Sequence, residues 1–323
     1  MGRRYLITGG AGFIGSNFIR HLARREPDAS VINLDALTHA GVRETVEELD
    51  VSTNHTFVRG DVRDMELVDA LVAEVDVIVH FAAESHVDRS IAGPASFVET
   101  NVVGTGNLLE AGRRHGVSRF VLVSTDEVYG PVPEGEVDEE APLKPSSPYS
   151  ASKAGADLLA EAYARTYGYR PIITRCANNY GPYQFPEKVI PLFVTNLIQE
   201  RPVPLYGDGS HEREWLAVDD HCAAVHLLVD AGKPGEIYNV GSGIRVSNLE
   251  LARRILERFE RDDSWIEHVP DRPGHDRRYA VDSTKIRALG WAPTTDLDAG
   301  LDRTVAWYRQ RQDWWWPLRE TVS

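Results

Sequence analysis

Cysteine is scarce in this sequence, and no long hydrophobic run occurs in it. Cys176 and Cys222 are its only cysteines among 323 residues. Two cysteines are too few for a disulfide framework, and neither shows the spacing of a metal site, so we expect two buried thiols and no metal centre. No stretch reaches the ~20 apolar residues of a membrane helix, and no signal-peptide pattern is recognisable. These absences lead us to expect a cytoplasmic protein.

Basic residues are also in the minority. The chain has 35 Lys and Arg against 49 Asp and Glu, which gives a formal net charge of −14. This balance, without any basic run, argues against binding to nucleic acid. Hydrophobic residues make up 42% of the chain, enough for a real core. Because single cores stop growing at roughly 250–300 residues, we expect one large domain with a smaller lobe.

A glycine-rich turn follows the first predicted strand. The strand is Tyr5–Thr8, the turn GGAGFIG occupies residues 9–15, and an amphipathic helix over 16–25 comes next. Glycines at such a turn let the backbone approach a pyrophosphate, whose charge the helix N-terminus stabilises. Glycine loops also end helices and form bulges, but the flanking strand and helix favour a dinucleotide site.

An acid ends the second predicted strand. The strand covers 31–34 and leads into Asp35, about 20 residues after the last glycine, where an acid hydrogen-bonds the adenosine ribose hydroxyls. Because this carboxylate would repel a 2′-phosphate, we expect NAD rather than NADP as the cofactor.

Strand and helix patterns then alternate, which predicts an α/β fold with a Rossmann-type, doubly wound parallel sheet. We expect an NAD-binding domain over 1–175, with a return segment near 213–240, and a mainly substrate-binding lobe over 176–323. The further strands are expected at 56–58, 75–79, 120–123 and 171–174, and the helices at 64–74, 95–115 and 150–167.

Two adjacent acids follow one of these strands. Thr125, Asp126 and Glu127 come directly after the apolar segment 120–124. Ligands of open α/β sheets bind outside the carboxyl ends of the strands, so these side chains are aimed at a substrate. One carboxyl could give a proton while the other takes one. A solvated turn would explain a single acid equally well, but here the neighbouring motifs point to chemistry.

Tyr149 and Lys153 form a second chemical motif. Their YxxxK spacing places them one helical turn apart on one face. An ammonium beside the phenol lowers a pKa that is about 10 when unperturbed, so we expect Tyr149 to act as a base toward a sugar hydroxyl. Chance can produce this spacing in any helix, yet the glycine turn and Asp35 make chance a poor explanation.

At these residues the chain resembles the extended short-chain dehydrogenase/reductase family, and within it the dTDP-glucose 4,6-dehydratases. The resemblance runs nearly end to end. It is carried by GGAGFIG at 9–15, DALT at 35–38, AAESHVDRS at 82–90, STDEVYG at 124–130, PSSPYSASKA at 145–154, RCANNYGPYQFPEK at 175–188, DRPGHDRRYA at 271–280 and WWWPL at 314–318. Sister epimerases share the glycine turn and YxxxK but lack the Asp-Glu pair.

The resemblance implies an enzyme, a lyase of class EC 4.2.1.46 in deoxysugar biosynthesis. Tyr149 would take the C4 hydroxyl proton of dTDP-glucose while NAD takes the C4 hydride. Glu127 would then remove the C5 proton, Asp126 would protonate the leaving C6 hydroxyl, and the hydride would return to C6. Thr125 would bond the C4 oxygen. The family also implies a C-terminal sugar-nucleotide-binding lobe and a homodimer that pairs the helices near 95–115 and 150–167.

Binding residues follow from the strand ends and from the resemblance. The cofactor contacts expected are Gly9, Gly12, Phe13, Ile14, Gly15, Asp35, Leu37, Thr38, Asp61, Val62, Phe81, Ala82, Ala83, Ser85, Thr100, Tyr149, Lys153 and Asn179. The substrate contacts implied are Ser85, Thr125, Asn178, Lys188, Val189, Pro204, Tyr206, Arg213, Asn248, Arg272 and His275. Three of these have equally good structural explanations: Arg213 and Arg272 as partners of nearby acids, and Tyr206 as a core aromatic.

Some positions depart from the family pattern. His39 stands where the family usually has Tyr, and we expect it beside the adenine rather than in catalysis. Glu212 and Ala217 also differ, and they leave the sugar and base preference open. The alternatives are therefore a dehydratase for UDP-glucose or a substituted hexose, a nucleotide-sugar 4-epimerase, and a non-catalytic NAD-binding protein.

Overall fold

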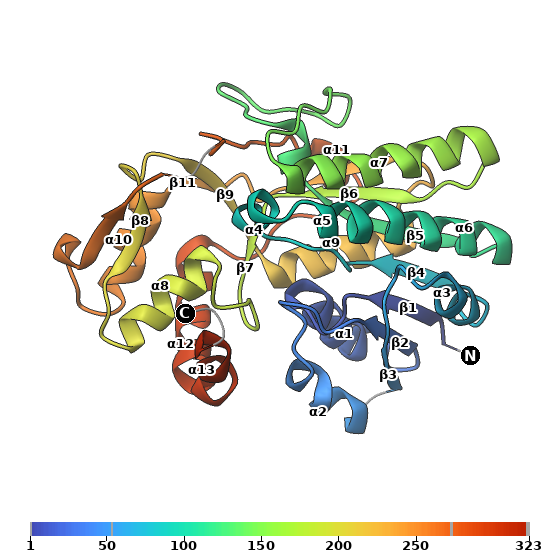
Figure 1. Cartoon of the computed structure of the whole chain (residues 1–323), viewed down its shortest axis with the longest axis horizontal. Coiled ribbons are helices and arrows are strands. Elements are labelled where there is room, and N and C mark those ends of the chain that lie inside the picture. The colour runs from blue at the N-terminus through green and yellow to red at the C-terminus, as the bar shows by residue number, and fades with distance from the viewer. Residues whose placement is uncertain (1, 53, 272–273, 321–323) are drawn as a thin grey trace.

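A seven-stranded parallel sheet forms the centre of the protein. The computed structural model describes residues 2–52, 54–271 and 274–320 (Figure 1). The strand order is β10-β6-β5-β4-β1-β2-β3, and every neighbouring pair is parallel. The strands are β1 (Arg4–Thr8), β2 (Ser30–Asp35), β3 (His55–Arg59), β4 (Val77–His80), β5 (Arg119–Thr125), β6 (Ile172–Cys176) and β10 (Ile237–Val240). The predicted Rossmann-type α/β fold is confirmed.

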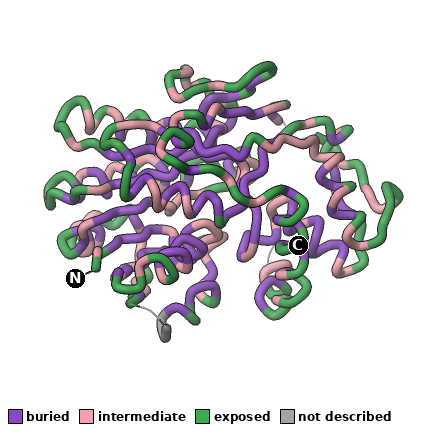
Figure 2. Tube along the Cα trace, turned by 180° about the vertical axis from the view of Figure 1, so that it is seen from behind, coloured by how far each residue is buried: buried purple, intermediate pink, exposed green. Residues whose placement is uncertain are grey.

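Helices cover both faces of this sheet because successive strand residues point to opposite sides. Tyr5 and Ile7 of β1 pack with α1 (Phe13–Arg25), α2 (Glu44–Ser52) and α9 (Val218–Ala231). Leu6 packs on the other side with α3 (Met65–Val72), α6 (Thr105–His115) and α7 (Pro148–Tyr167). Figure 2 shows the strands as a buried layer between helices whose outer surfaces are exposed.

The element boundaries show where the local signals act. Helix α1 begins at Phe13, earlier than predicted, directly after an extended Gly12. Helix α7 begins at Pro148 behind a capping box of Ser147 and Ser150, which satisfies backbone donors at its first turn. The helix expected over 95–115 is present as α5 (Ala95–Val98), a π-helical turn η1 (Glu99–Gly104) and α6. Helix α2 was not predicted.

The smaller lobe is built mainly from the second half of the chain. Its core is rich in aromatic side chains, among them Trp215, Tyr308, Trp314 and Trp315. It contains a three-stranded sheet, β11-β9-β7, and a two-stranded sheet, β12-β8. These elements are β7 (Asn178–Tyr180), α8 (Val189–Ile198), β8 (Val203–Tyr206), β9 (Glu212–Ala217), β11 (Arg245–Ser247), α10 (Asn248–Glu257), η3 (Asp263–Trp265), β12 (Ile266–Val269), α12 (Leu297–Gln310) and α13 (Gln312–Glu320).

The chain returns to the large sheet after β9. Helix α9 packs on α1, and β10 adds an edge strand beside β6, with α11 (Thr284–Arg287) packed against it. Both α9 and β10 fall in the segment predicted to return, while the precise domain boundaries stay a prediction. No helix in the described part of the chain is long and apolar enough to cross a membrane.

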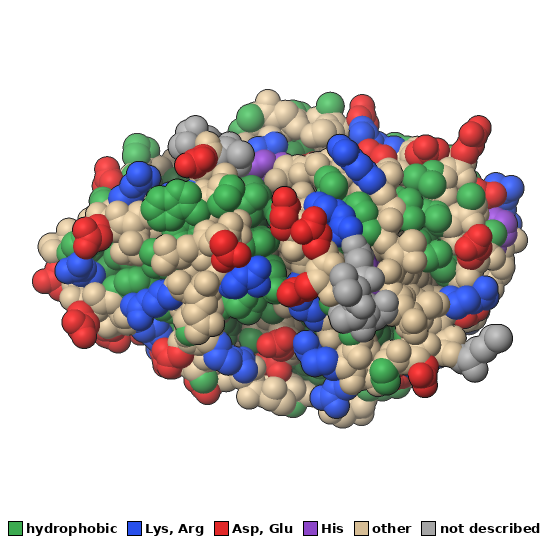
Figure 3. Space-filling view, turned by 90° about the horizontal axis from the view of Figure 1, so that it is seen from below, with side chains coloured by type: hydrophobic (Ala, Val, Ile, Leu, Met, Phe, Trp, Pro, Cys, Tyr) green, Lys and Arg blue, Asp and Glu red, His purple; other side chains and the backbone are tan. Residues whose placement is uncertain are grey.

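The surface carries charges of both signs. On the face shown in Figure 3, acidic and basic side chains are interspersed rather than gathered by sign. On that face, basic side chains do not gather into a patch of the kind that draws a polyanion to a protein.

Candidate active site

A cavity of about 300 Å³ opens at the carboxyl ends of the strands. Strand β1 lies between β2 and β4, so the chain reverses its direction of strand addition at this point. Crevices at such reversal points are the usual ligand sites of open α/β sheets. The cavity is lined by all five residues predicted to be catalytic and by every predicted cofactor contact except Leu37. Their roles stay predictions, but the structure brings them together.

The glycine turn permits close contacts that no side chain would allow. Gly9 has a φ of 71°, and a Cβ there would lie 2.5 Å from the backbone nitrogen of Ala82. A Cβ at Gly15 would lie 2.3 Å from the Gly9 carbonyl oxygen. Helix α1 then begins at Phe13 with its N-terminus at the cavity. The turn therefore fits a dinucleotide diphosphate, which needs close backbone approach and unsatisfied N–H groups.

Asp35 organises the end of the cavity that is expected to hold the adenosine. Its side chain is buried and accepts hydrogen bonds from the backbone N–H groups of Ala11 (2.9 Å) and Leu37 (2.8 Å). Burial raises the pKa of Asp35, and the two N–H groups oppose that rise. Leu37 does not line the cavity, but its left-handed backbone (φ 52°) presents its N–H to this carboxyl.

His39 also lines this end, bound to residues that sequence reasoning missed. Its Nε2 lies 2.7 Å from a carboxylate oxygen of Glu187, and its ring packs on Phe185. Glu187 and Phe185 line the cavity too. Both residues belong to the loop before α8. Nothing in the sequence around His39 indicates that this loop lies beside it. The placement agrees with a position near the adenine.

Asp126 is suited to carry a proton. It is buried, and burial together with the nearby Glu127 and Glu214 raises its pKa well above the ordinary range. Its Oδ1 accepts a hydrogen bond from Thr125 Oγ1 at 3.3 Å, while Oδ2 has no hydrogen-bond partner among the described residues. The backbone N–H of Glu127 donates to the same Thr125 hydroxyl. Thr125 thus fixes both acids at the end of β5.

Tyr149 and Lys153 lie one turn apart on α7 and face the cavity. The Lys153 ammonium donates to the carbonyl of Val123 at 2.7 Å. The prediction of a lowered Tyr149 pKa is wrong. Burial and the Glu127 carboxylate raise the pKa of Tyr149 well above its ordinary value, and only the Thr125 hydroxyl opposes them. The motif places the two groups correctly but says nothing about the acids that face them.

Four predicted substrate contacts lie in the same cavity: Ser85, Thr125, Asn178 and Lys188. The Lys188 ammonium donates to the Ser85 carbonyl, and the Asn178 amide oxygen has no partner among the described residues. Asn179 is fixed by His221, whose Nδ1 lies 2.9 Å from its amide oxygen. Cys176 is buried as predicted, yet it also lines the cavity, which sequence reasoning did not foresee.

Known proteins share this arrangement. The family described as GDP-mannose 4,6 dehydratase matches residues 6–304. The chain belongs to this family. A dTDP-glucose 4,6-dehydratase of Streptomyces niveus is 53% identical over 98% of this chain and 96% of that protein. The low-salt glycan biosynthesis protein Agl12 of Haloferax volcanii is 52% identical over 94% and 97%. A crystal structure of a dTDP-glucose 4,6-dehydratase from Streptomyces venezuelae, with NAD and TYD bound, has a TM-score of 0.95 at 53% identity and covers 98% of this chain and 99% of that one.

The remaining substrate contacts implied by the family, as far as the structure describes them, do not line the cavity. Arg213 on β9 is buried, donates to the Asp276 carbonyl at 2.8 Å and lies over the Tyr279 ring. Pro204 and Tyr206 are on β8, and Asn248 begins α10. Val189 begins α8 beside the cavity residue Lys188. Arg272 lies outside the described residues.

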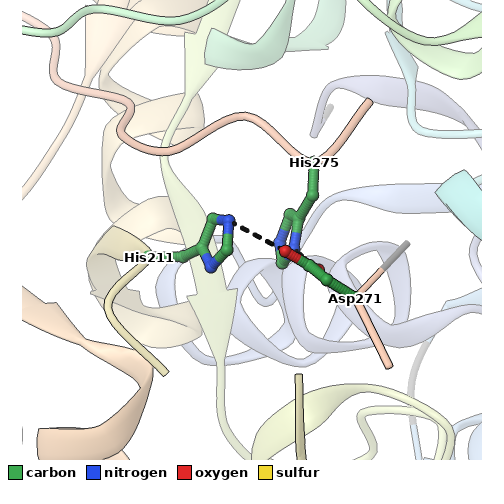
Figure 4. A group of neighbouring side chains, drawn as sticks. All are labelled: His211, Asp271 and His275. Atoms are coloured by element: carbon green, nitrogen blue, oxygen red, sulfur yellow. Dashed lines mark hydrogen bonds and ion pairs between the residues drawn. The ribbon is translucent and has the colours of Figure 1, made fainter. Parts of the chain in front are cut away.

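His275, the last of these contacts, belongs to a cluster with Asp271 and His211 (Figure 4). Its Nδ1 lies 2.6 Å from Asp271 Oδ1, and its ring is stacked on His211 with centroids 3.8 Å apart and planes 12° from parallel. Two imidazoles bound to one ion point their nitrogens at it within their ring planes. Face-to-face rings do not, so this geometry favours a hydrogen-bonded stack over a metal site.

Proposed function

We propose that this chain is an NAD-dependent dTDP-glucose 4,6-dehydratase that forms dTDP-4-keto-6-deoxyglucose. The observation that carries the proposal is the buried Asp126 with a raised pKa, placed with Glu127, Tyr149 and Lys153 around one cavity. An acid, a base and a Tyr/Lys pair are together what an oxidation followed by a dehydration requires. A named dehydratase that is 53% identical over 98% of this chain supports the same reaction.

The residues present fit NAD. Gly9 and Gly15 leave room for the diphosphate, the N-terminus of α1 faces it, and Asp35 is placed for the ribose hydroxyls. When bound, NAD would supply a hydride acceptor for C4 and, once reduced, a hydride donor for C6. Ala82 and Ala83 line the cavity with small side chains, which leaves the space that a flat ring system needs.

The protein's own groups move the protons. Tyr149 takes the proton of the C4 hydroxyl, and Thr125 hydrogen-bonds the same oxygen. Once C4 is a ketone, the C5 proton is acidic; Glu127 removes it and returns a proton to C5 when the hydride reaches C6. Asp126 gives its proton to the C6 hydroxyl as this leaves as water. The raised pKa of Asp126 keeps that proton available, and its unpartnered Oδ2 can carry it.

The smaller lobe supplies the nucleotide end of the substrate site. Arg213 and His275 lie in this lobe with Tyr206, whose ring packs edge-on against His275. A guanidinium suits a diphosphate, and an aromatic ring suits a base. Ala217 at the end of β9 and Glu212 at its start differ from the family pattern, so UDP-glucose or a substituted hexose is the alternative substrate.

The direct test is turnover of dTDP-glucose beside UDP-glucose. The product of a 4,6-dehydration is a 4-keto-6-deoxy sugar, which gives an ultraviolet chromophore after base is added. We expect the chromophore with dTDP-glucose. With substrate deuterated at C4, the label should appear at C6. A product that differs from the substrate only in its C4 configuration would instead make the protein a 4-epimerase. A protein that turns over neither substrate would be a non-catalytic NAD-binding protein.

Replacing Asp35 tests the cofactor assignment. Asp35→Ala should weaken NAD binding and relax the preference over NADP, because the carboxylate that bonds the ribose and repels a 2′-phosphate is lost. We expect the wild-type protein to purify with NAD, which can be assayed in the supernatant after denaturation. Asp28→Ala, in the exposed turn after α1, is the control. Wild-type protein that binds NADP more tightly than NAD would contradict the assignment.

We further propose a homodimer. Exposed apolar side chains gather on helices that pack together: Val98 on α5, Val103 on η1 and Leu158 on α7, with Ile91 on α4 (Val87–Ala92) nearby. A cluster of exposed apolar side chains marks a protein interface more often than a free surface. The helices are those that the family implies for the dimer contact.

The dimer is tested by charging this surface. Val103→Asp and Leu158→Asp should each shift the protein from dimer to monomer in sedimentation velocity, because an unpaired charge would be buried at the contact. Trp316→Asp, which changes an exposed aromatic residue of α13, should leave the dimer intact. Wild-type protein that sediments as a monomer at micromolar concentration would exclude the proposal.

A further inference from the structure

A buried ion network lies beneath the cavity, and the mechanism above does not use it. Asp157 is on α7, one turn after Lys153, and is fully buried. One of its carboxylate oxygens, Oδ2, accepts a hydrogen bond from Arg175 Nε at 2.9 Å. Arg175 is on β6 and only 1% exposed. A buried ion pair costs solvation of both charges, so it often serves a purpose other than stability.

Arg175 is itself fixed from the far side. Its NH1 group donates to the Tyr129 hydroxyl at 2.9 Å, and its guanidinium lies 4.8 Å from the centre of the Tyr129 ring. The Tyr129 hydroxyl in turn donates to Asn239 on β10 at 2.8 Å. This chain of bonds leads from the edge of the sheet to α7. It determines where the Asp157 carboxylate lies relative to Lys153.

Asp157 is the anion that faces the buried part of Lys153. The other groups around the ammonium are neutral there: burial raises the pKa of the Cys176 thiol on β6 to about 12 and lowers that of His80 on β4 to about 3. On the cavity side lie Tyr149, Asp126 and Glu127. Burial lowers the pKa of Lys153, and Asp157 is the strongest influence that raises it again.

We propose that Asp157, oriented by Arg175, is a positioning residue that keeps the Lys153 ammonium charged, one helical turn from the catalytic Tyr149. Lys153, Arg175 and Asp157 together carry one net positive charge beside the cavity. This charge favours a phenolate at Tyr149 as the phenol loses its proton. The part of this inference that concerns C4 oxidation rests on the proposed function. The ionisation of Lys153 can be measured whether or not the protein has that function.

The first experiment measures the Lys153 ammonium directly. The chain has only five lysines, so a protein labelled with 13C at lysine Cε gives few signals, and Lys153→Met assigns the relevant one. Asp157→Asn keeps the shape of the side chain and removes its charge. We expect the pKa of Lys153 to fall by about 1 unit or more, the usual scale for losing an opposite charge within 4–6 Å.

The second experiment asks whether catalysis follows. The rate of C4 oxidation is measured as transient NADH over a range of pH. In Asp157→Asn the fall of this rate on the alkaline side should begin at a lower pH than in the wild type, while KM for dTDP-glucose is unchanged. Glu161→Gln is the matched control: Glu161 lies one turn further on α7, 4.0 Å from Arg175, and bonds Arg165 at the surface. That variant should keep the wild-type profile.

A purely structural role of Asp157 predicts that Asp157→Asn lowers Tm and leaves the Lys153 pKa near that of the wild type. The proposal predicts that Arg175→Lys, which keeps the positive charge but loses the bond geometry to Asp157 and Tyr129, lowers the Lys153 pKa by less than Asp157→Asn does, because the carboxylate remains. The proposal is overturned if Asp157→Asn leaves the Lys153 pKa unmoved, or if Arg175→Lys lowers it equally. Wild-type protein that fails to oxidise dTDP-glucose would reject the proposed function, while the titration would still decide the role of Asp157.

Discussion

Asp126→Asn should reduce formation of the 4-keto-6-deoxy product by ~100-fold or more, the scale of a lost general acid. The variant keeps Tyr149, Lys153 and Glu127, so oxidation at C4 and removal of the C5 proton should continue. NADH absorbance should therefore appear and persist, and solvent deuterium should enter C5. Asn has nearly the same shape as Asp, and its amide can still accept the Thr125 hydrogen bond, so the fold should be unaffected.

Glu127→Gln is the matched partner of that variant. It should still oxidise C4, because Tyr149 is intact, but it should not exchange deuterium into C5. The two variants are compared in one single-turnover experiment that follows absorbance at 340 nm and the label at C5 by NMR. If both retain full dehydration, or if the two patterns are reversed, the assignment of acid and base to these positions fails.

The large sheet could be predicted from sequence because its signals are local. Apolar runs gave β1, β2, β5 and β6 to within a few residues, and the glycine turn gave the start of the cofactor site. Helix α2 was missed because four of the nine residues in its segment, Glu44–Ser52, are acidic and its apolar face is weak, with Val46 and Leu49 as the buried apolar residues among those described. Its position depends on packing against α1 and β3, which the local sequence does not encode.

The residues of the site could be predicted from the sequence, but their pKa values could be predicted less well. Motifs placed Thr125, Asp126 and Tyr149 around one cavity. They did not show that the pKa of Tyr149 is raised, because that rise comes from burial and from Glu127 across the cavity. Contacts such as His39 with Glu187, 148 residues apart, are equally invisible before folding.

The distribution of charge gives the three protonating groups separate tasks. Asp126 is enclosed, and its raised pKa favours the protonated form, while Glu127 is more exposed and lies beside it. Burial and Glu127 oppose the ionisation of Tyr149, so its proton leaves more readily where positive charge lies beside it. Lys153 provides such a charge, and oxidised NAD would supply another.

Tyr149→Phe should consequently stop the reaction at its first step. Without the phenol, no group in the cavity takes the C4 hydroxyl proton, so we expect no NADH and no deuterium at C5, and a loss of turnover of ~10²–10⁴-fold, the range for a general base. The ring should keep its place, since it packs edge-on against Phe97 with centroids 6.3 Å apart. Bound NAD should therefore remain at the wild-type level.

The control for this variant lies on the same helix. Tyr163→Phe removes a hydroxyl that reaches Glu110 at 3.4 Å, away from the cavity, and should leave turnover unchanged. The pair separates loss of the base from any general effect of removing a phenol from α7. Together with Asp126→Asn and Glu127→Gln, Tyr149→Phe orders the three steps: it blocks oxidation, Glu127→Gln blocks exchange after oxidation, and Asp126→Asn blocks elimination after both. NADH formation at the wild-type rate in Tyr149→Phe would place the first proton transfer on a different group.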